Sequence, residues 1–307
     1  MIDSSDLPPP RRGRSDPEML PTPFVVEPTT EHTHTFILLH GLGSNGHKFG
    51  SVLLETGKTT DGRTLAEHFT GARFIFPTAR RRRSTAFKRA MLTMWFDVPN
   101  LADRHDRSYK QQPGLAESFR YIKKIIDEEC GKVERGKESV SKSTVPRQNI
   151  ILGGLSNGCA MSLICAIALE RGLGGIVGLS GWLPFQPQIE TEVTVMDDKE
   201  SPADLAHAGR DYARDVVLEW ERPAETEEDA ERNMMPVFLA HGTEDGKLPF
   251  EMGESARDTM EKLGFEVEWH GYEGLGHWYS IPEEIDDVVR FLYDKCGLPK
   301  TTTTTTE

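Results

Sequence analysis

Short, continuous apolar runs alternate with longer amphipathic segments along most of this chain. Residues 114–129 place apolar side chains at helical spacing, and 157–169 are apolar on almost all sides, which predicts a helix buried against a sheet. The apolar runs predict buried strands, at 35–39, 72–76, 150–152, 174–180, 236–240 and 265–272. We therefore expect an α/β fold with a mostly parallel central sheet and helices on both faces.

The two ends of the chain lack this alternation. Residues 1–30 contain six prolines before Phe24 and little periodicity, which predicts a disordered leader, and 299–307 are dominated by threonine. We expect one domain over 31–298, with inserted segments near 131–147 and 190–232. Within this leader, we expect the folded part to begin around the apolar run Phe24–Val26.

The most informative stretch is NIILGGLSNGCAM at 149–161, where an apolar run leads into a glycine-rich turn and then a run of helix formers. It predicts a strand, a sharp turn and a helix, with Ser156 at the apex. Such a serine has a strained backbone, and side chains in place of Gly154 or Gly158 would collide with neighbouring elements. The pattern G-x-S-x-G presents a nucleophile in many hydrolases, although a glycine-rich turn with an idle serine would read the same.

Two later strand ends carry residues that could act with Ser156. One strand stops at HGTEDGKLP, which contains Asp245, and the last strand is followed by GLGHW, which contains His277. Because the carboxyl ends of parallel strands meet at one edge of the sheet, we expect these side chains to converge. The chain order Ser, Asp, His is one of the known orders of a catalytic triad. The alternative acid and the alternative base are Glu244 and His241.

The first long strand ends in HGLGSNG at 40–46, where backbone N–H groups could turn toward an anion. A phosphate-binding loop would look similar, but the chain lacks the Lys-Ser/Thr completion of a P-loop and a G-x-G-x-x-G motif. Nucleotide binding is therefore not expected.

Charge and cysteine content narrow the function further. The net charge is −13, and residues 190–232 hold 15 acids against 5 bases, which argues against nucleic-acid binding. The four cysteines have no C-x-x-C spacing, so we expect reduced thiols in a cytoplasmic protein and no metal site. We also expect the acidic segment to be a solvated excursion, such that replacing 192–230 by a short linker leaves hydrolysis of a small ester within a few-fold.

Between Ala72 and Phe96 the chain has seven basic residues and no acid, including the run Arg80–Arg83. A solvated, irregular loop is one reading. The other is a cationic lip that, with neighbouring apolar residues, touches an anionic membrane transiently.

Taken together, LLHGLGSNG, FIFPTA, MWFD, ILGGLSNGCAM, GLSGWLP, LAHGTEDGKLP and GLGHW resemble, in that order, the phospholipase/carboxylesterase family, which includes acyl-protein thioesterases and lysophospholipases. The resemblance covers roughly residues 34–296 and implies an α/β-hydrolase fold, no cofactor, and hydrolysis of acyl esters or thioesters. It implies that Ser156 is the nucleophile, His277 the base and Asp245 the orienting acid. Leu42 and Asn157 would supply the oxyanion N–H groups. We expect three residues to contact the acyl group, Met94, Trp95 and Leu248.

The chain departs from the family pattern at Ser44, where an acid is usual, at Asn157, where Gln is usual, and at Trp278, where Ser is usual. These departures concern substrate choice, which the sequence leaves open between an acylated protein, a lysophospholipid and a small ester. The alternative of another class is a non-catalytic binding protein that recruits a basic partner through its acidic segment. The oligomeric state is not predicted.

Overall fold

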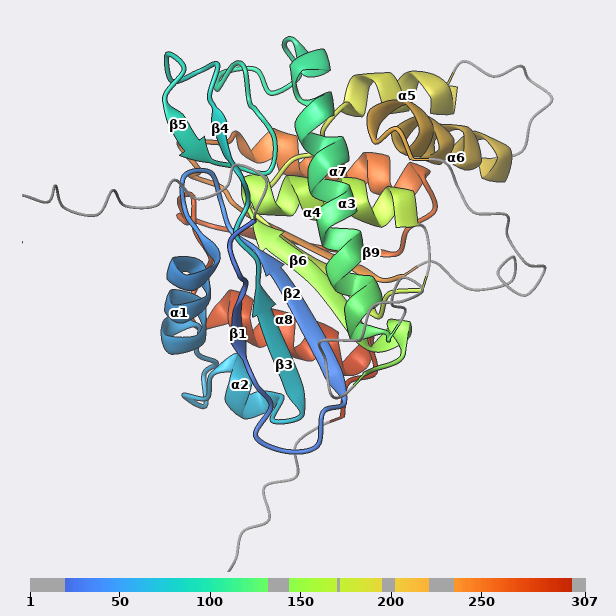
Figure 1. The fold of residues 1–307 in the computed structure, drawn as a ribbon. Helices are drawn as coiled ribbons and strands as arrows, with labels where there is room; N and C mark the ends of the chain where they lie inside the picture. The colour runs from blue at the N-terminus through green and yellow to red at the C-terminus, as the bar shows by residue number, and fades with distance from the viewer. Residues whose placement is uncertain (1–19, 132–143, 170–171, 195–201, 221–234, 300–307) are drawn as a thin grey trace, which may run out of the picture.

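The computed structural model describes residues 20–131, 144–169, 172–194, 202–220 and 235–299. Within them, seven strands form a central sheet in the order β1-β3-β2-β6-β7-β8-β9 (Figure 1). All neighbours run parallel except β1, which is antiparallel to β3. The predicted mostly parallel sheet is confirmed. Its strands are β1 Phe24–Val26, β2 His34–Leu39, β3 Ala72–Phe76, β6 Ile150–Leu155, β7 Gly175–Leu179, β8 Val237–Gly242 and β9 Val267–Tyr272.

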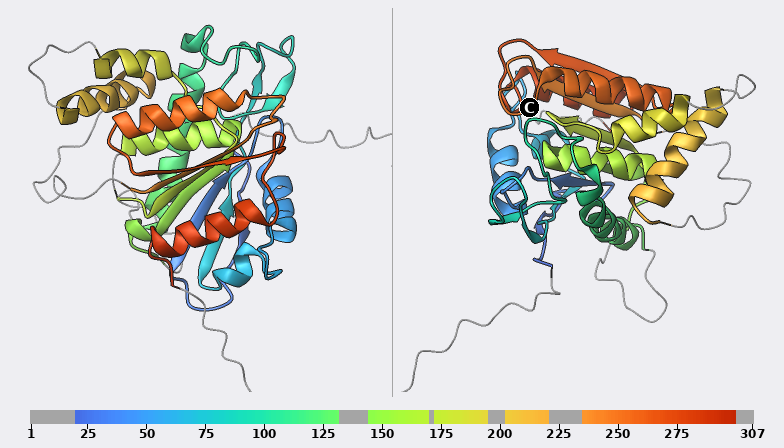
Figure 2. Two further views of the ribbon diagram at one scale, coloured as in Figure 1. Left: turned by 180° about the vertical axis from the view of Figure 1, so that it is seen from behind. Right: turned by 90° about the horizontal axis from the view of Figure 1, so that it is seen from above.

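Helices cover both faces of this sheet (Figure 2). One face packs on α3, α4 and α7, and the other on α1, α2 and α8. Strand β2 shows why its run is continuously apolar, because Ile37 faces the first group of helices and Phe36 the second. The helices are α1 Gly46–Thr56, α2 Leu65–His68, α3 Gln112–Glu129, α4 Asn157–Leu169, α5 Gln186–Thr194, α6 Pro202–Asp211, α7 Phe250–Lys262 and α8 Glu283–Asp294, with short helices η1 Ser108–Lys110, η2 Arg147–Asn149 and η3 Tyr212–Val217.

The first strand of the fold is β1, which starts at Phe24 and so lies within the predicted leader 1–30. Strand β1 pairs with β3, with Phe24 opposite Phe76 and their rings 5.9 Å apart. The expectation that the folded part begins around Phe24–Val26 therefore agrees with β1, and only the leader bound at residue 30 is too far along the chain. Three parts of these predictions lie outside the described residues: 1–19 of the leader, 132–143 of the first predicted insertion and 300–307 of the predicted tail.

The basic segment after β3 forms a hairpin apart from the central sheet. Strands β4 (Arg81–Arg83) and β5 (Met91–Thr93) pair antiparallel. We call residues 81–93 the basic hairpin. None of the helices in the described part of the chain is both long and apolar enough to cross a bilayer.

The described part of the acidic segment packs into the core, so its interpretation as a solvated excursion is wrong. Helix α5, α6 and η3 lie against α3, α4 and α7, and Ile189, Ala213 and Val217 are fully buried in the same cluster as α4. Acidic residues dominate the composition, and Asp204 and Asp215 are exposed on these helices, which concealed a few apolar positions at helical spacing. Residues 195–201 and 221–234 lie outside the described residues.

This packing predicts a contrast between two adjacent valines of η3. Val217 is 0% exposed and Val216 is 46% exposed. Val217→Asp should lower the free energy of unfolding by on the order of 3 kcal/mol, because a carboxylate would be buried without a partner. Val216→Asp should change it by about 0.5 kcal/mol or less. Urea unfolding measures both, and equally small effects would show that the segment does not support the core.

Candidate active site

Ser156 stands at the sharp turn between β6 and α4. Its φ is +58°, in the left-handed region that non-glycine residues rarely adopt. A Cβ on Gly158 would lie 2.1 Å from the carbonyl oxygen of Leu39 in β2, and a Cβ on Gly154 would lie 2.6 Å from the same atom. The close approach of β2 therefore requires both glycines, and it holds the strained serine above the end of the sheet.

His277 and Asp245 reach this serine from the ends of two other strands. His277 follows β9, and its Nε2 lies 2.9 Å from Ser156 Oγ. Its Nδ1 lies 2.6 Å from Oδ2 of Asp245, which follows β8. Because the carboxylate can only accept, Nδ1 carries the proton and Nε2 is left to accept from the serine hydroxyl. The three residues that the sequence singled out thus form one continuous chain of hydrogen bonds.

Several donors converge on the carboxylate of Asp245. The N–H groups of Lys247 and Leu248 donate to its Oδ1 at 2.8 and 2.9 Å, and His241 Nε2 lies 3.2 Å from Oδ2. Burial alone would raise the pKa of Asp245, but the hydrogen bonds from His277, Leu248 and Lys247 lower it below its usual value. The carboxylate is therefore ionised at neutral pH, as an acceptor for the Nδ1 proton must be.

The two alternative residues occupy other positions. Glu244 is exposed to solvent. His241 is buried, and its Nε2 lies 3.0 Å from the carbonyl oxygen of Leu248, to which it donates. Burial lowers the pKa of His241, which keeps it neutral. It braces the turn that carries Asp245.

The loop after β2 is held by a buried histidine and a buried tryptophan. The Ala79 N–H donates to His40 Nε2 at 3.1 Å, so Nδ1 carries the proton and donates to the Gly41 carbonyl at 2.7 Å. Burial lowers the pKa of His40 to about 4. Trp95 Nε1 donates to the His40 carbonyl at 2.9 Å. These bonds fix the backbone that leads into Leu42, which borders Ser156.

Asn157 is the first residue of α4, so its N–H has no acceptor inside the helix. Its side chain has a different task, because Oδ1 accepts from the Trp95 N–H at 2.9 Å. Asn157 therefore links the turn at Ser156 to the segment that follows the basic hairpin.

A cavity of about 650 Å³ opens beside Ser156 and His277. Its walls are mostly apolar, formed by Leu42, Phe49, Phe87, Leu101, Leu155 and Trp278. Met94, Trp95 and Leu248 do not line it, so their predicted contact with an acyl group is not supported. All three are buried in the interior. The apolar side chains of Met94 and Trp95 pack in the core. Leu248 contributes to the site through its backbone N–H, which donates to Asp245.

Sequence reasoning missed two charged residues of this cavity, Arg104 and Lys247. Arg104 lies in an irregular loop whose amino-acid composition is that of an ordinary polar surface segment. Lys247 was visible beside Asp245, but nothing in the pattern distinguished its side chain from a solvated one. Trp278 was noted only as a departure, and it lines the cavity while its ring stacks on Tyr279 with centroids 4.9 Å apart.

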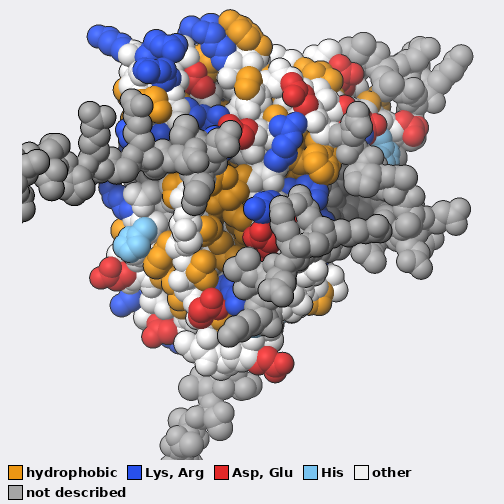
Figure 3. All heavy atoms as spheres, in the orientation of Figure 1, with side chains coloured by type: hydrophobic (Ala, Val, Ile, Leu, Met, Phe, Trp, Pro, Cys, Tyr) orange, Lys and Arg blue, Asp and Glu red, His pale blue; other side chains and the backbone are white. Residues whose placement is uncertain are grey.

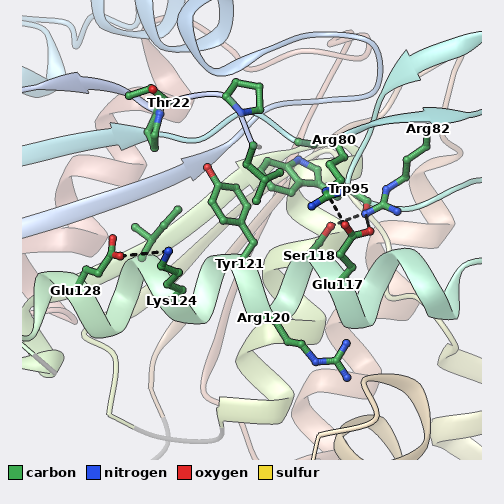
Figure 4. A pocket seen from close by; sticks show the side chains of 15 residues that line it. Thr22, Arg80, Arg82, Trp95, Glu117, Ser118, Arg120, Tyr121, Lys124 and Glu128 are labelled. Atoms are coloured by element: carbon green, nitrogen blue, oxygen red, sulfur yellow. Dashed lines mark hydrogen bonds and ion pairs between the residues drawn. The ribbon is translucent and has the colours of Figure 1, made fainter. Parts of the chain in front are cut away.

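A second cavity, of about 610 Å³, lies along α3, and two arginines of the run Arg80–Arg83 line it (Figure 4). Arg80 and Arg82 both point to Glu117, each with a nitrogen 2.6 Å from a carboxylate oxygen. Arg81 and Arg83 are exposed instead. The alternation follows from strand geometry, which sends successive side chains to opposite sides. The run is therefore two pairs of arginines with different surroundings.

Comparisons with known proteins identify the family to which this chain belongs. A family model described as phospholipase/carboxylesterase matches residues 20–224. Acyl-protein thioesterase 1 of Yarrowia lipolytica is 31% identical over 277 residues, which cover 89% of this chain and 97% of the relative. Carboxylesterase SOBER1 of Arabidopsis thaliana is 27% identical, covering 81% and 86%. Among solved structures, acyl-protein thioesterase 2 of Zea mays shares the fold, with a TM-score of 0.61 at 24% identity over 90% of this chain and 99% of that one. The family model covers two thirds of this chain, and the Yarrowia lipolytica relative aligns with it over almost the relative's whole length. The chain therefore belongs to the phospholipase/carboxylesterase family of α/β-hydrolases.

Proposed function

We propose that this protein is a serine hydrolase that cleaves acyl thioesters or carboxylic esters through a covalent acyl-enzyme. The observation that carries the proposal is the hydrogen-bonded chain from Ser156 Oγ through His277 to Asp245. A serine hydroxyl is a weak nucleophile until a base accepts its proton, and His277 Nε2 stands within hydrogen-bonding distance with its lone pair free for that proton.

In the first half of the reaction, Ser156 Oγ attacks the acyl carbonyl carbon while its proton passes to His277 Nε2. The carbonyl oxygen becomes an oxyanion, which the N–H groups of Leu42 and Asn157 would receive. Asp245 stabilises the imidazolium that forms and keeps Nδ1 protonated. His277 then donates its proton to the departing thiolate or alkoxide.

In the second half, water takes the place of the leaving group. His277 accepts a proton from the water, whose oxygen attacks the acyl-enzyme carbonyl at the same oxyanion site. Collapse of the intermediate releases the carboxylic acid and returns the proton to Ser156.

Among substrates, an acylated protein has the strongest support, because several relatives aligned over most of this chain are named acyl-protein thioesterase 1. A small ester is the second candidate, since another relative is named a carboxylesterase. A lysophospholipid is the third, on the family description alone. Turnover compared across acyl chain lengths on thioesters and oxygen esters distinguishes the three.

The competing proposal from another class, a non-catalytic binding protein, would leave Ser156 unreactive. A fluorophosphonate probe labels only an activated serine, so it separates the two possibilities without knowledge of the substrate. Labelling that is lost in Ser156→Ala supports the hydrolase.

The triad assignment predicts a graded series of losses. Ser156→Ala or His277→Ala should reduce kcat for a small ester by on the order of 10⁶, and Asp245→Asn by about 10⁴, because only the last change leaves nucleophile and base in place. The neighbouring Glu244→Gln is the matched control and should have almost no effect, since Glu244 faces solvent. A crippled Glu244→Gln with a mild Asp245→Asn would mean that the acid is wrongly assigned.

We also propose that the basic hairpin docks transiently on an anionic membrane surface, in a cytoplasmic setting that suits the four free cysteines. Figure 3 shows Lys and Arg side chains gathered over β4 and β5. The exposed cations of the hairpin flank two exposed apolar side chains, Phe87 and Met91, and Phe87 also lines the cavity at Ser156. A membrane-bound acyl chain would thereby meet the entrance of the cavity. Each cation near an anionic surface contributes about 1 kcal/mol.

This docking predicts a loss confined to membrane-bound substrates. The variant changes the four exposed cations of the hairpin to Gln: Arg81, Arg83, Lys88 and Arg89. It should bind more weakly to vesicles that contain phosphatidylserine, and it should turn over an acyl substrate in those vesicles more slowly. Arg80 and Arg82 stay unchanged because they pair with Glu117. Turnover of a soluble short-chain ester should stay within a few-fold, and added salt should abolish the vesicle effect.

The matched control changes four exposed lysines outside the hairpin to Gln: Lys58, Lys110, Lys262 and Lys295. It changes the net charge equally and should retain more vesicle binding. Equal losses in both proteins would indicate a non-specific charge effect, and equal losses on vesicle and soluble substrates would place the hairpin cations in the support of the fold.

A further inference from the structure

The cavity beside Ser156 has a charge that contrasts with the rest of the protein. The whole chain has a net charge of −13. Among the described residues that line this cavity, however, none is Asp or Glu, and two are basic, Arg104 and Lys247. The remaining lining residues are apolar or neutral apart from His277. A cavity built only for an uncharged acyl chain has no need of this charge.

Arg104 is buried, with 7% of its surface exposed. Its guanidinium donates to the carbonyl oxygens of Lys247 at 2.9 Å and Asn100 at 3.3 Å, and lies 5.4 Å from the centre of the Trp182 ring. Within the described part of the chain, it forms no ion pair with any carboxylate, and its Nε has no hydrogen-bond partner. Arg104 is therefore a buried cation that neutral groups hold in place.

Burial of such a charge is unfavourable. A buried cation without a counterion is destabilising, and carbonyl groups and an aromatic face offset this only in part. Burial lowers the pKa of Arg104, and the negative charge of Asp245 raises it, but an arginine stays protonated. Asp245 is itself engaged by His277 and two backbone N–H groups, so it is not a counterion in contact. A charge that the fold leaves unpaired at the wall of a cavity is suited to an anion brought by the ligand.

We propose that Arg104, assisted by the exposed Lys247 at the same wall, makes this cavity select substrates that carry an anionic group near the scissile ester or thioester bond. The anion is a carboxylate or a phosphate, for which a guanidinium is the best-matched side chain. It belongs either to the acyl group or to the leaving group, and the same cation would recognise both. The inference rests on the proposed hydrolase activity and adds a substrate class to it.

A structural role for Arg104 is the competing explanation. Its bond to the Lys247 carbonyl ties the loop of Arg104 to the turn that holds Asp245. Loss of this tie would misplace Asp245 and slow the hydrolysis of every substrate equally. A role in recognition instead changes the ratio between charged and neutral substrates, so the ratio separates the two explanations.

The experiment compares two matched pairs of substrates. Mono-p-nitrophenyl adipate and p-nitrophenyl hexanoate differ by a carboxylate on the acyl side. The hexanoyl thioesters of 3-mercaptopropionate and of 3-mercaptopropionamide differ by a carboxylate on the leaving group. The wild-type protein should have a roughly tenfold or greater kcat/KM advantage for the anionic member of at least one pair. That pair identifies the side of the bond on which the anion lies.

Arg104→Met should lower the ratio of anionic to neutral kcat/KM by about 10- to 100-fold. Arg104→Lys should restore part of it, because the charge returns without the planar fork. The matched control is Arg107→Met, in the same loop, whose guanidinium is exposed and pairs with Asp106 at 3.0 Å. This control removes the same charge outside the cavity and should leave the ratio unchanged.

Three results would overturn the inference. They are a wild-type protein with no preference for either anionic substrate, an unchanged ratio in Arg104→Met, and an equal fall of the ratio in Arg107→Met. If Arg104→Met fails to fold, the wild-type preference decides, and it should also weaken as salt is added. Failure of the proposed function would look different, with no hydrolysis of the neutral esters and no fluorophosphonate labelling of Ser156.

Discussion

The close approach of β2 to the turn at Ser156 is the constraint on which the rest of the site depends. The Leu39 carbonyl lies where a side chain at Gly158 would stand, so the two strands and α4 meet with backbone against backbone. This contact lifts Ser156 into a left-handed conformation above the sheet. It also places the loop that begins at His40 beside the serine, since that loop continues directly from Leu39. One steric contact thus brings Ser156, the proposed nucleophile, and the backbone at Leu42, a proposed oxyanion donor, together.

Asp245 and His277 reach the same edge because the remaining strands are parallel. β8 and β9 end side by side, so the turn that carries Asp245 and the loop that carries His277 are neighbours. Buried polar bonds then set their orientation. His241 and two backbone N–H groups hold the carboxylate, and the carboxylate holds the imidazole. The proposed chemistry therefore depends on hydrogen bonds whose partners lie far apart in the sequence but on adjacent strand ends.

The charge at the site depends on where individual charged residues lie in the fold, and not on the net charge of the chain. In α6 and η3, Asp204 and Asp215 are exposed, whereas Ala213 and Val217 are buried in the core. Arg82 pairs with Glu117 in the second cavity, whereas Arg104 at the wall of the cavity beside Ser156 has no carboxylate partner among the residues that the structure describes. A net charge of −13 thus describes the solvated surface and says nothing of the field at Ser156.

The sequence by itself determined the strands, the turn at Ser156 and the identity of Asp245 and His277, because buried strands and glycine-rich turns leave a local pattern of residue types. Tertiary structure alone decided which side chains line the cavity. Trp95 lies in the core while Arg104 reaches the cavity. Such neighbours belong to segments far apart in the chain. A local pattern records whether a position is buried, but packing between distant segments decides what it is buried against.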